Sequence, residues 1–357
     1  MNVRGLVARY PLRAPALGAI LLAGTVLVDV VVLIATMIDL QRGAMANWSF
    51  GIGLELQYQS ARRRGTRWPG WYLWRAALLF TEGLLHYVFD VLMGYAVTAM
   101  IVAWLIGRSD RAVRAWMITV GTLHVLVVGL LTVAIASAAP AATEPPLAFA
   151  TDSWTDQVLD RIALAPVYRI EAVFIIPLGI VLFLAGSRLL RAGALADDAV
   201  GRRIRARLMA VGLGVAAPLN LLTTFADWFL VDRYLLAPFV ALGLLGLITT
   251  VVYRLTAVPG LLGTGLTAVG RTALSCYLLQ NLVAAVLCYG WGFGLAARFV
   301  DARPWRVIGA WTGICALLMT LSVWWLRRFD RGPLERLSHW AYHPAATRLA
   351  FSGLSGV

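Results

Sequence analysis

Long apolar stretches alternate along this chain with short polar segments that are rich in arginine. A transmembrane helix needs roughly 20 mostly apolar residues, so each long stretch predicts one membrane span. The sequence therefore predicts an all-α, polytopic integral membrane protein, a single transmembrane helical domain over residues 1–357. Ten spans are expected, at 14–37, 44–60, 72–89, 90–107, 115–138, 166–187, 208–226, 234–253, 272–290 and 305–326.

Composition and charge agree with a membrane protein. Hydrophobic residues make up 60% of the chain and charged residues 14%, whereas soluble domains carry about 25% charged residues. A soluble globular enzyme is thereby excluded. All 31 basic side chains are arginines, and with 18 acidic residues the net charge is +13. Because the arginines stand in short clusters between apolar runs, they indicate membrane topology; we expect contact with membrane lipid and no nucleic-acid partner.

The distribution of arginine predicts the orientation of the chain. Arginines in short loops remain on the cytoplasmic side. With the N-terminus inside, 24 of the 31 arginines fall in segments on the inner side. Both termini are therefore predicted to be cytoplasmic, with residues 327–357 as a cytoplasmic tail. The first apolar run, which begins after Arg13, is too long for a signal-peptide h-region, so it is expected to be a retained helix.

The longest outside connection is an extracytoplasmic loop at 139–165. It begins with the proline-containing AAPAATEPP, which is typical of a loop. Its second half carries Asp152, Trp154, Asp156 and Asp160. This half either forms a short helix at the membrane interface or covers a pocket that faces outward.

Three ionisable residues recur at helical spacing in the third span. Glu82, His86 and Asp90 follow one another at intervals of four, which places them on one face of a helix. Such residues are costly in a membrane span and are functional candidates by default. An imidazole flanked by carboxylates can act as a general base. The alternative is a buried polar network that ties this helix to its neighbours.

Other polar residues in the spans support weaker hypotheses. His124 has no acidic residue within a helical turn and is expected to bond to a neighbouring helix. Asp29 requires a partner that the sequence does not identify. His339 and His343 have metal-compatible spacing but no third ligand, so no metal site is expected. The cysteines lie in apolar stretches and are expected to be buried as small hydrophobic side chains: Cys276, Cys288 and Cys315.

The ninth span begins with a cluster of polar residues. Arg271 stands at its cytoplasmic edge, where it is either a helix anchor or a ligand for phosphate groups of a cofactor. Tyr277, Gln280 and Asn281 follow within the bilayer as candidate substrate-binding residues. The same amide pair also suits close packing between helices.

This region resembles the C-terminal signature of the YeiB-like bacterial membrane proteins, domain of unknown function 418. The resemblance rests on GRTALSCYLLQN, YGWGFGL and WLRRFDRGPLERL, and it extends upstream through APFVALGLLGL, LFLAGSRLLRAGAL, GLLHYVFDVLMGYAV and WSFGIGLELQ. The first helix departs from the family pattern, with Pro11 and Ala14 where an aspartate and a glycine are expected.

The family is similar to the transmembrane acyltransferases, and this likeness implies a function. It implies a protein of the bacterial cytoplasmic membrane that transfers an acyl group from a cytoplasmic acyl-CoA-type donor to an extracytoplasmic glycan or lipid. His86 would be the general base, Glu82 or Asp90 would orient it, and Arg271 would hold the donor; no tightly bound cofactor is expected. Two rivals stay open: a transporter or flippase with a proton relay, and a non-catalytic subunit of an envelope complex or homo-oligomer.

Overall fold

The computed structural model describes residues 39–66, 68–70, 72–73, 76–77, 92–137, 153–163, 171–226, 228–254, 260–298 and 303–337. Within these ranges every regular element is a helix, as expected. The helices are α3 (Asp39–Arg63), α5 (Leu92–Leu105), α6 (Asp110–Ser137), α7 (Trp154–Ala163), α9 (Ala172–Arg191), α10 (Ala199–Val211), η1 (Gly212–Ala216), α11 (Ala217–Phe225), α12 (Phe229–Val231), η2 (Asp232–Leu236), α13 (Ala237–Arg254), α14 (Leu261–Arg271), α15 (Ala273–Cys288), α16 (Leu295–Arg298) and α17 (Arg303–Leu326).

Several of these helices are long and apolar enough to cross a membrane. In the described part of the chain there are five, at 110–137, 172–191, 199–225, 229–254 and 309–326. The bent pair α14 and α15 would make a sixth, and α5 is a shorter apolar helix. A multi-pass membrane protein is therefore supported. The count of ten spans and the orientation of the termini stay predictions, and the first expected span lies outside the described residues.

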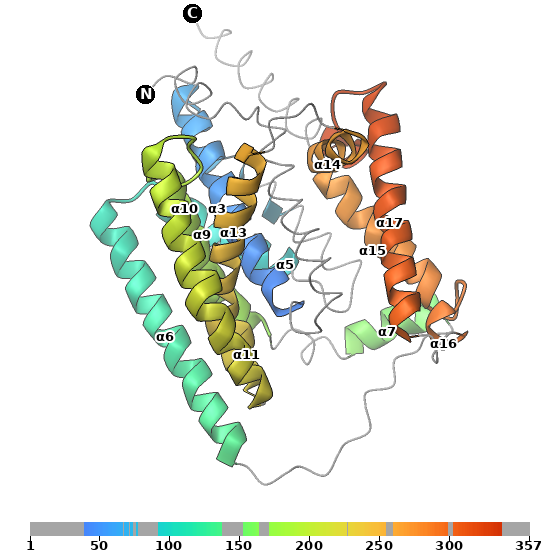
Figure 1. The fold of residues 1–357 in the computed structure, drawn as a ribbon, viewed down its shortest axis with the longest axis horizontal. Helices are drawn as coiled ribbons and strands as arrows, with labels where there is room; N and C mark the ends of the chain where they lie inside the picture. The colour runs from blue at the N-terminus through green and yellow to red at the C-terminus, as the bar shows by residue number, and fades with distance from the viewer. Residues whose placement is uncertain are drawn as a thin grey trace, which may run out of the picture. The chain divides into compact units, whose positions relative to one another are not determined.

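The helices fall into two compact units. The first contains α3, α5, α6 and the helices from α9 to α13, and the second contains α14 to α17. The short helix α7 lies within the predicted loop at 139–165; whether this segment lies at the membrane interface or covers a pocket stays a prediction. Figure 1 shows α10 and α11 of the first unit running alongside α13, with which both are in contact.

Helix α9 is central to the first unit, where it packs against α3, α5 and α6. Its contact with α3 is close because glycines stand at the crossing. A Cβ atom on Gly51 would lie 2.3 Å from the main-chain oxygen of Phe183, and one on Gly186 would lie 2.7 Å from that of Trp48. This proximity of the two backbones brings the C-terminal ends of α3 and α9 together.

Two five-residue π-helical turns interrupt the spans of the first unit, and each ends immediately before an Ala-Pro pair. Proline has no N–H, so the carbonyl four residues earlier loses its α-helical donor. For Pro238 that carbonyl belongs to Tyr234. The buried ring of His124 supplies the missing donor through Nε2, 3.0 Å from the oxygen of Tyr234. The expected bond between His124 and a neighbouring helix is thereby confirmed.

In the second unit, α14 and α15 meet at Thr272 with a bend of 97°. The sequence predicts a span at 272–290 and leaves residues 261–271 between two spans, whereas the structure has the helix α14 there. At the bend, the hydroxyl of Thr272 forms a hydrogen bond with the hydroxyl of Ser322 on α17 at 2.8 Å.

The cysteines of the second unit differ in exposure. Cys276 packs in a small core with Val269 and Leu318, as expected. Cys315 is only partly buried. The expectation of burial is wrong for Cys288, which is exposed because it is the last residue of α15, beyond the packed part of the helix.

Candidate functional site

The predicted catalytic residues cannot be placed: Glu82, His86 and Asp90 lie outside the described residues, as do Asp29, His339 and His343. The other predicted site residues lie in the second unit. Arg271 ends α14, and its guanidinium donates to the main-chain oxygen of Asp330 at 2.8 Å. Half-buried positions on α15 hold Tyr277, Gln280 and Asn281.

The contact of Arg271 belongs to a larger junction between α15 and the segment after α17. The carboxylate of Glu335 accepts hydrogen bonds from the main-chain amides of Leu274 and Ser275, at 2.7 and 3.2 Å, and from the hydroxyl of Ser275 at 2.5 Å. An acidic side chain at a helix N-terminus satisfies free N–H groups and interacts favourably with the helix dipole. Two stretches that carry the resemblance, 270–281 and 325–337, therefore bond directly to each other.

A different site stands out in the first unit. It is an open pocket of about 560 Å³ at the ends of α3, α5 and α9. Its size is that of a small-molecule site. Its polar lining is mostly basic, and the residues are Glu55, Tyr58, Gln59, Arg62, Arg63, Ile106, Gly107, Arg108 and Arg191.

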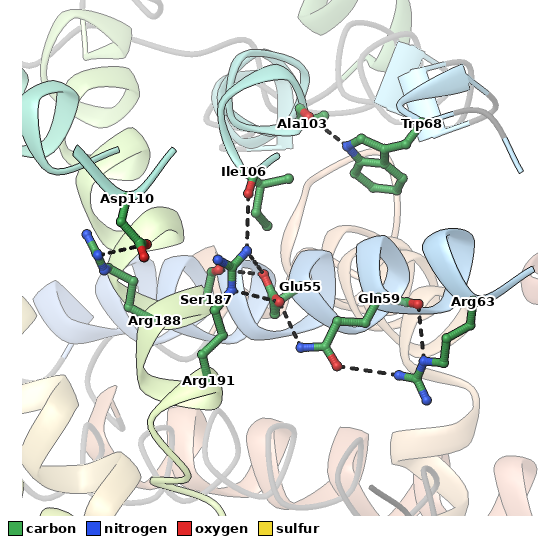
Figure 2. Close-up of polar contacts among 10 residues, drawn as sticks. All are labelled: Glu55, Gln59, Arg63, Trp68, Ala103, Ile106, Asp110, Ser187, Arg188 and Arg191. Carbon is green, nitrogen blue, oxygen red and sulfur yellow. Dashed lines mark hydrogen bonds and ion pairs between the residues drawn. The ribbon is translucent and has the colours of Figure 1, made fainter. Parts of the chain in front are cut away.

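Glu55 is the structural centre of this pocket (Figure 2). It is 1% exposed, and both its oxygens are fully used. Oε1 accepts from Nε of Arg191 at 2.9 Å and from Gln59 at 2.7 Å. Oε2 accepts from Nη2 of Arg191 at 2.9 Å and from the hydroxyl of Ser187 at 2.6 Å. Because each oxygen already accepts two bonds, Glu55 is suited to orient Arg191 rather than to act as a base.

Arg191 joins three segments at the pocket. Besides its bidentate hydrogen bonds to Glu55 on α3, its guanidinium donates to the main-chain oxygen of Ile106, just beyond α5, at 3.1 Å. Its own side chain remains 38% exposed. Nearby, Arg188 pairs with Asp110 at the start of α6 at 3.1 Å (Figure 2). A guanidinium held in a fixed orientation at a pocket wall is well arranged to bind a planar or tetrahedral anion.

The other arginines of the lining carry positive charge that no carboxylate neutralises within the described ranges. Arg62 lies over the ring of Tyr58 at 5.9 Å, and Arg63 bonds to the main-chain oxygen of Gln59 at 3.1 Å. Arg108 lies in the connection between α5 and α6. No ion pair forms on these three side chains among the residues that the structure describes. The lining therefore has four arginines against one carboxylate.

Tyr58 is the aromatic residue of the lining, and Trp68 packs against it. The ring of Trp68 packs edge-on against that of Tyr58, with 5.4 Å between centroids. The indole of Trp68 donates to the main-chain oxygen of Ala103 at 2.7 Å, which fixes it to α5 (Figure 2). A Cβ on Gly107 would lie 3.2 Å from the hydroxyl of Tyr58, so the small residue leaves room for that ring.

Sequence reasoning did not single out this pocket, although one signal was available. Glu55 lies inside the predicted span 44–60, where a carboxylate is costly and needs a partner. That partner, Arg191, is 136 residues away in sequence and is found only in the fold. Three arginine-bearing segments that the charge distribution assigns to the same side of the membrane meet at the pocket.

Comparison with known proteins agrees with the resemblance found in the sequence. The family described as "protein of unknown function (DUF418)" matches residues 189–344. The DUF418 match begins within the last turn of α9, includes Arg191 and reaches through the junction of α15 with Glu335.

Two curated proteins are similar to this chain. It is 27% identical over 342 residues to "Uncharacterized protein YeiB" of Escherichia coli (strain K12), an alignment that covers 86% of this chain and 81% of the relative. It is 38% identical over 92 residues to "Uncharacterized protein YxaH" of Bacillus subtilis (strain 168), covering 25% of this chain and 22% of that protein. No solved structure matches the chain. The resemblance to the YeiB-like proteins is confirmed, and the link to acyltransferases stays a prediction.

Proposed function

We propose that this DUF418 protein is an integral-membrane acyltransferase that binds a phosphate-bearing, acyl-CoA-type donor in the arginine pocket of its first unit. The observation that carries the proposal is the excess of guanidinium groups around Glu55 and Arg191. Arginine makes strong, geometrically defined bonds to phosphate. A donor with several phosphate groups complements a lining of this charge.

The predicted topology puts the pocket on the cytoplasmic side of the membrane. The arginines of the lining come from three segments that the charge distribution predicts to be cytoplasmic. The first segment carries Arg62 and Arg63, the second Arg108 and the third Arg191. A cytoplasmic pocket is where an acyl-CoA donor would be available. The acceptor in this proposal is a glycan or lipid on the outer side of a bacterial cytoplasmic membrane.

The proposed chemistry assigns the remaining roles to residues named from the sequence. His86 removes the proton of the acceptor as its oxygen or nitrogen attacks the acyl carbonyl, and Glu82 or Asp90 orients the imidazole. The carbon–sulfur bond of the thioester then breaks, and the coenzyme A thiolate leaves and is protonated by the imidazolium. General-base catalysis of this kind typically contributes about 10²- to 10⁴-fold. For the second unit, the roles of Arg271 as a donor ligand and of Tyr277, Gln280 and Asn281 as acceptor ligands stay predictions from the sequence.

Donor binding tests the pocket directly. Isothermal titration calorimetry of the purified full-length protein with coenzyme A is expected to show binding. A hydrogen bond to a charged group is worth about 1.5–3 kcal/mol, so the double variant Arg63→Gln/Arg108→Gln is expected to weaken binding by tenfold or more. The matched control is Arg111→Gln/Arg114→Gln, which removes two exposed arginines of α6 outside the lining. Equal weakening by both variants, or no binding to the unmodified protein, would contradict the proposed donor site.

Turnover tests the chemistry. Liposomes containing the protein would enclose acetyl-CoA and face a glucosamine-containing glycan or phosphatidylglycerol outside, with products measured by mass spectrometry. Acetylated product is expected, and His86→Ala is expected to abolish it. Undiminished turnover in His86→Ala would remove this histidine from the mechanism. Substrate movement that depends on pH and leaves no covalent product would instead support a transporter.

A further inference from the structure

A second buried carboxylate lies in the first unit, away from the arginine pocket. Asp232 begins the π-helical turn η2 within the apolar helix 229–254 and is 2% exposed. Its side-chain partners among the described residues are neutral and come from α11. They are the amide of Asn220 at 3.2 Å, the hydroxyl of Thr223, and the hydroxyl of Thr224 at 2.6 Å.

The neighbouring charged groups are engaged elsewhere. Arg233 pairs with Glu171, just before α9, at 2.6 Å, and the hydroxyl of Tyr234 donates to the same carboxylate at 2.7 Å. His124 on α6 bonds to the carbonyl of Tyr234. Among the described residues, no cation lies within ion-pair distance of Asp232. An ionised carboxylate buried without a cation is costly, and protonation removes that cost.

The two threonine hydroxyls can serve either protonation state. Each hydroxyl has one proton to donate and lone pairs with which to accept. Thr224 lies 2.8 Å from the carbonyl of Asn220 as well as 2.6 Å from Oδ2 of Asp232. Thr223 likewise reaches the carbonyls of Leu219 and Asn220, both at 3.1 Å, in addition to Oδ1 of Asp232.

Rotation of these hydroxyls interconverts two fully bonded arrangements. When Asp232 is ionised, both threonines donate to it. When Asp232 carries a proton on Oδ2, that proton is donated to the oxygen of Thr224, and the hydroxyl of Thr224 donates to the carbonyl of Asn220. No heavy atom has to move between the two arrangements. A carboxyl group can therefore gain or lose a proton here while every polar group keeps a partner.

We infer that Asp232, with Thr223, Thr224 and Asn220, forms a proton-binding site in the membrane part of the first unit. Uptake forms one O–H bond on Oδ2 with a proton from solvent, and release breaks it. Nothing is oxidised or reduced. The inference rests only on these contacts and is independent of acyl transfer and of the arginine pocket.

Infrared difference spectroscopy of the full-length protein in liposomes tests the site. Lowering the pH is expected to produce the C=O stretching band of a protonated carboxyl group in a low-polarity environment, shifted to lower frequency in D₂O. The band is expected to disappear in Asp232→Asn and to persist in Glu171→Gln, which removes the neighbouring carboxylate. A band that is retained in Asp232→Asn, or that no pH change produces, would overturn the inference.

If Asp232→Asn does not fold, the less disruptive variant Thr224→Val tests the same site. Thr224→Val removes a hydroxyl whose bond to the ionised carboxylate is stronger than its bond to the neutral acid. The pH at which half the band appears is therefore expected to differ between Thr224→Val and the unmodified protein, whereas Thr224→Ser should restore the original midpoint. An unchanged midpoint in Thr224→Val would contradict the site. So would a band that responds to sodium chloride but not to pH, which would indicate a monovalent cation instead.

Discussion

The imidazole of His124 donates from Nε2 to the main-chain oxygen of Tyr234, 110 residues further along the chain, at 3.0 Å. The bond exists because Pro238 cannot supply the N–H that an α-helix would direct at this oxygen. A side chain of α6 thereby completes the backbone bonding of a different span. His124 consequently has a structural role at the π-helical turn.

This hydrogen bond predicts that a second substitution, at Pro238, restores stability lost by substituting His124. His124→Leu is expected to destabilise the protein by about 1–3 kcal/mol, because it leaves a buried carbonyl without a donor. Adding Pro238→Ala restores a backbone N–H four residues after Tyr234, so the double variant should be more stable than His124→Leu alone. Thermal unfolding in detergent, followed by circular dichroism, measures the difference. Pro238→Ala by itself is the remaining variant of this double-mutant cycle. If the double variant is no more stable than His124→Leu, the result contradicts this role of His124.

The pair of Glu55 and Arg191 predicts unequal effects of its two partners. Arg191→Met leaves the carboxylate of Glu55 buried without a cation, and the loss of one partner of a buried pair costs about 3–5 kcal/mol. Glu55→Gln is expected to cost less, because the guanidinium left behind is 38% exposed and can be solvated. The double variant Glu55→Gln/Arg191→Met should recover part of the loss of Arg191→Met.

The measurement for this pair is a double-mutant cycle of unfolding free energies. Ser187→Ala, which removes a single hydrogen bond to Glu55, is a reference for a small loss of about 1 kcal/mol. Strictly additive effects of the two main substitutions would show that Glu55 and Arg191 do not act as a pair.

The crossing of α3 and α9 predicts opposite outcomes for two glycines that are two positions apart. Gly51→Ala would place a methyl group 2.3 Å from the oxygen of Phe183, and such overpacking is expected to cost about 1–3 kcal/mol. Gly53→Ala meets nothing within 4 Å and should leave stability unchanged or raise it by up to about 1 kcal/mol, as alanine favours a helix. Thermal unfolding of both variants compares them directly. Equal effects would mean that the two backbones do not pack as described.

The contact of Glu335 with α15 predicts local opening of that helix. Glu335→Ala removes the acceptor for the amides of Leu274 and Ser275 and is expected to cost about 0.5–2 kcal/mol, as for a lost helix cap. Hydrogen exchange at these amides should accelerate by roughly 2- to 30-fold if opening is local. Asp330→Asn is the matched control, since it removes an exposed negative charge nearby while keeping the carbonyl that accepts from Arg271. Unchanged exchange in Glu335→Ala would contradict the cap.

Local sequence patterns were sufficient to predict several of the long helices. Apolar runs predicted 115–138, 166–187 and 234–253, and the structure has α6, α9 and the segment from α12 to α13 at these places. The isolated position of His124 correctly predicted a bond to another helix. These predictions succeed because helix formation and membrane burial depend on side chains within one stretch of the chain.

The arginine pocket could not be derived in the same way. Glu55 meets Arg191 and Ser187 from a distant helix, and no periodicity relates the three positions. The bend at Thr272 was also missed, because its bonds to Ser322 depend on how α17 packs.

The amino-acid sequence alone predicted a helical, arginine-rich chain with apolar stretches of membrane-spanning length and a resemblance to the YeiB-like proteins, since hydropathy and charge are properties of consecutive residues. Only the tertiary structure decided which polar groups are satisfied by which partners. Inside an apolar bundle each buried carboxylate, carbonyl and guanidinium must find a partner within about 3 Å, and for Glu55, Asp232 and Tyr234 the packing of separate helical segments supplies it.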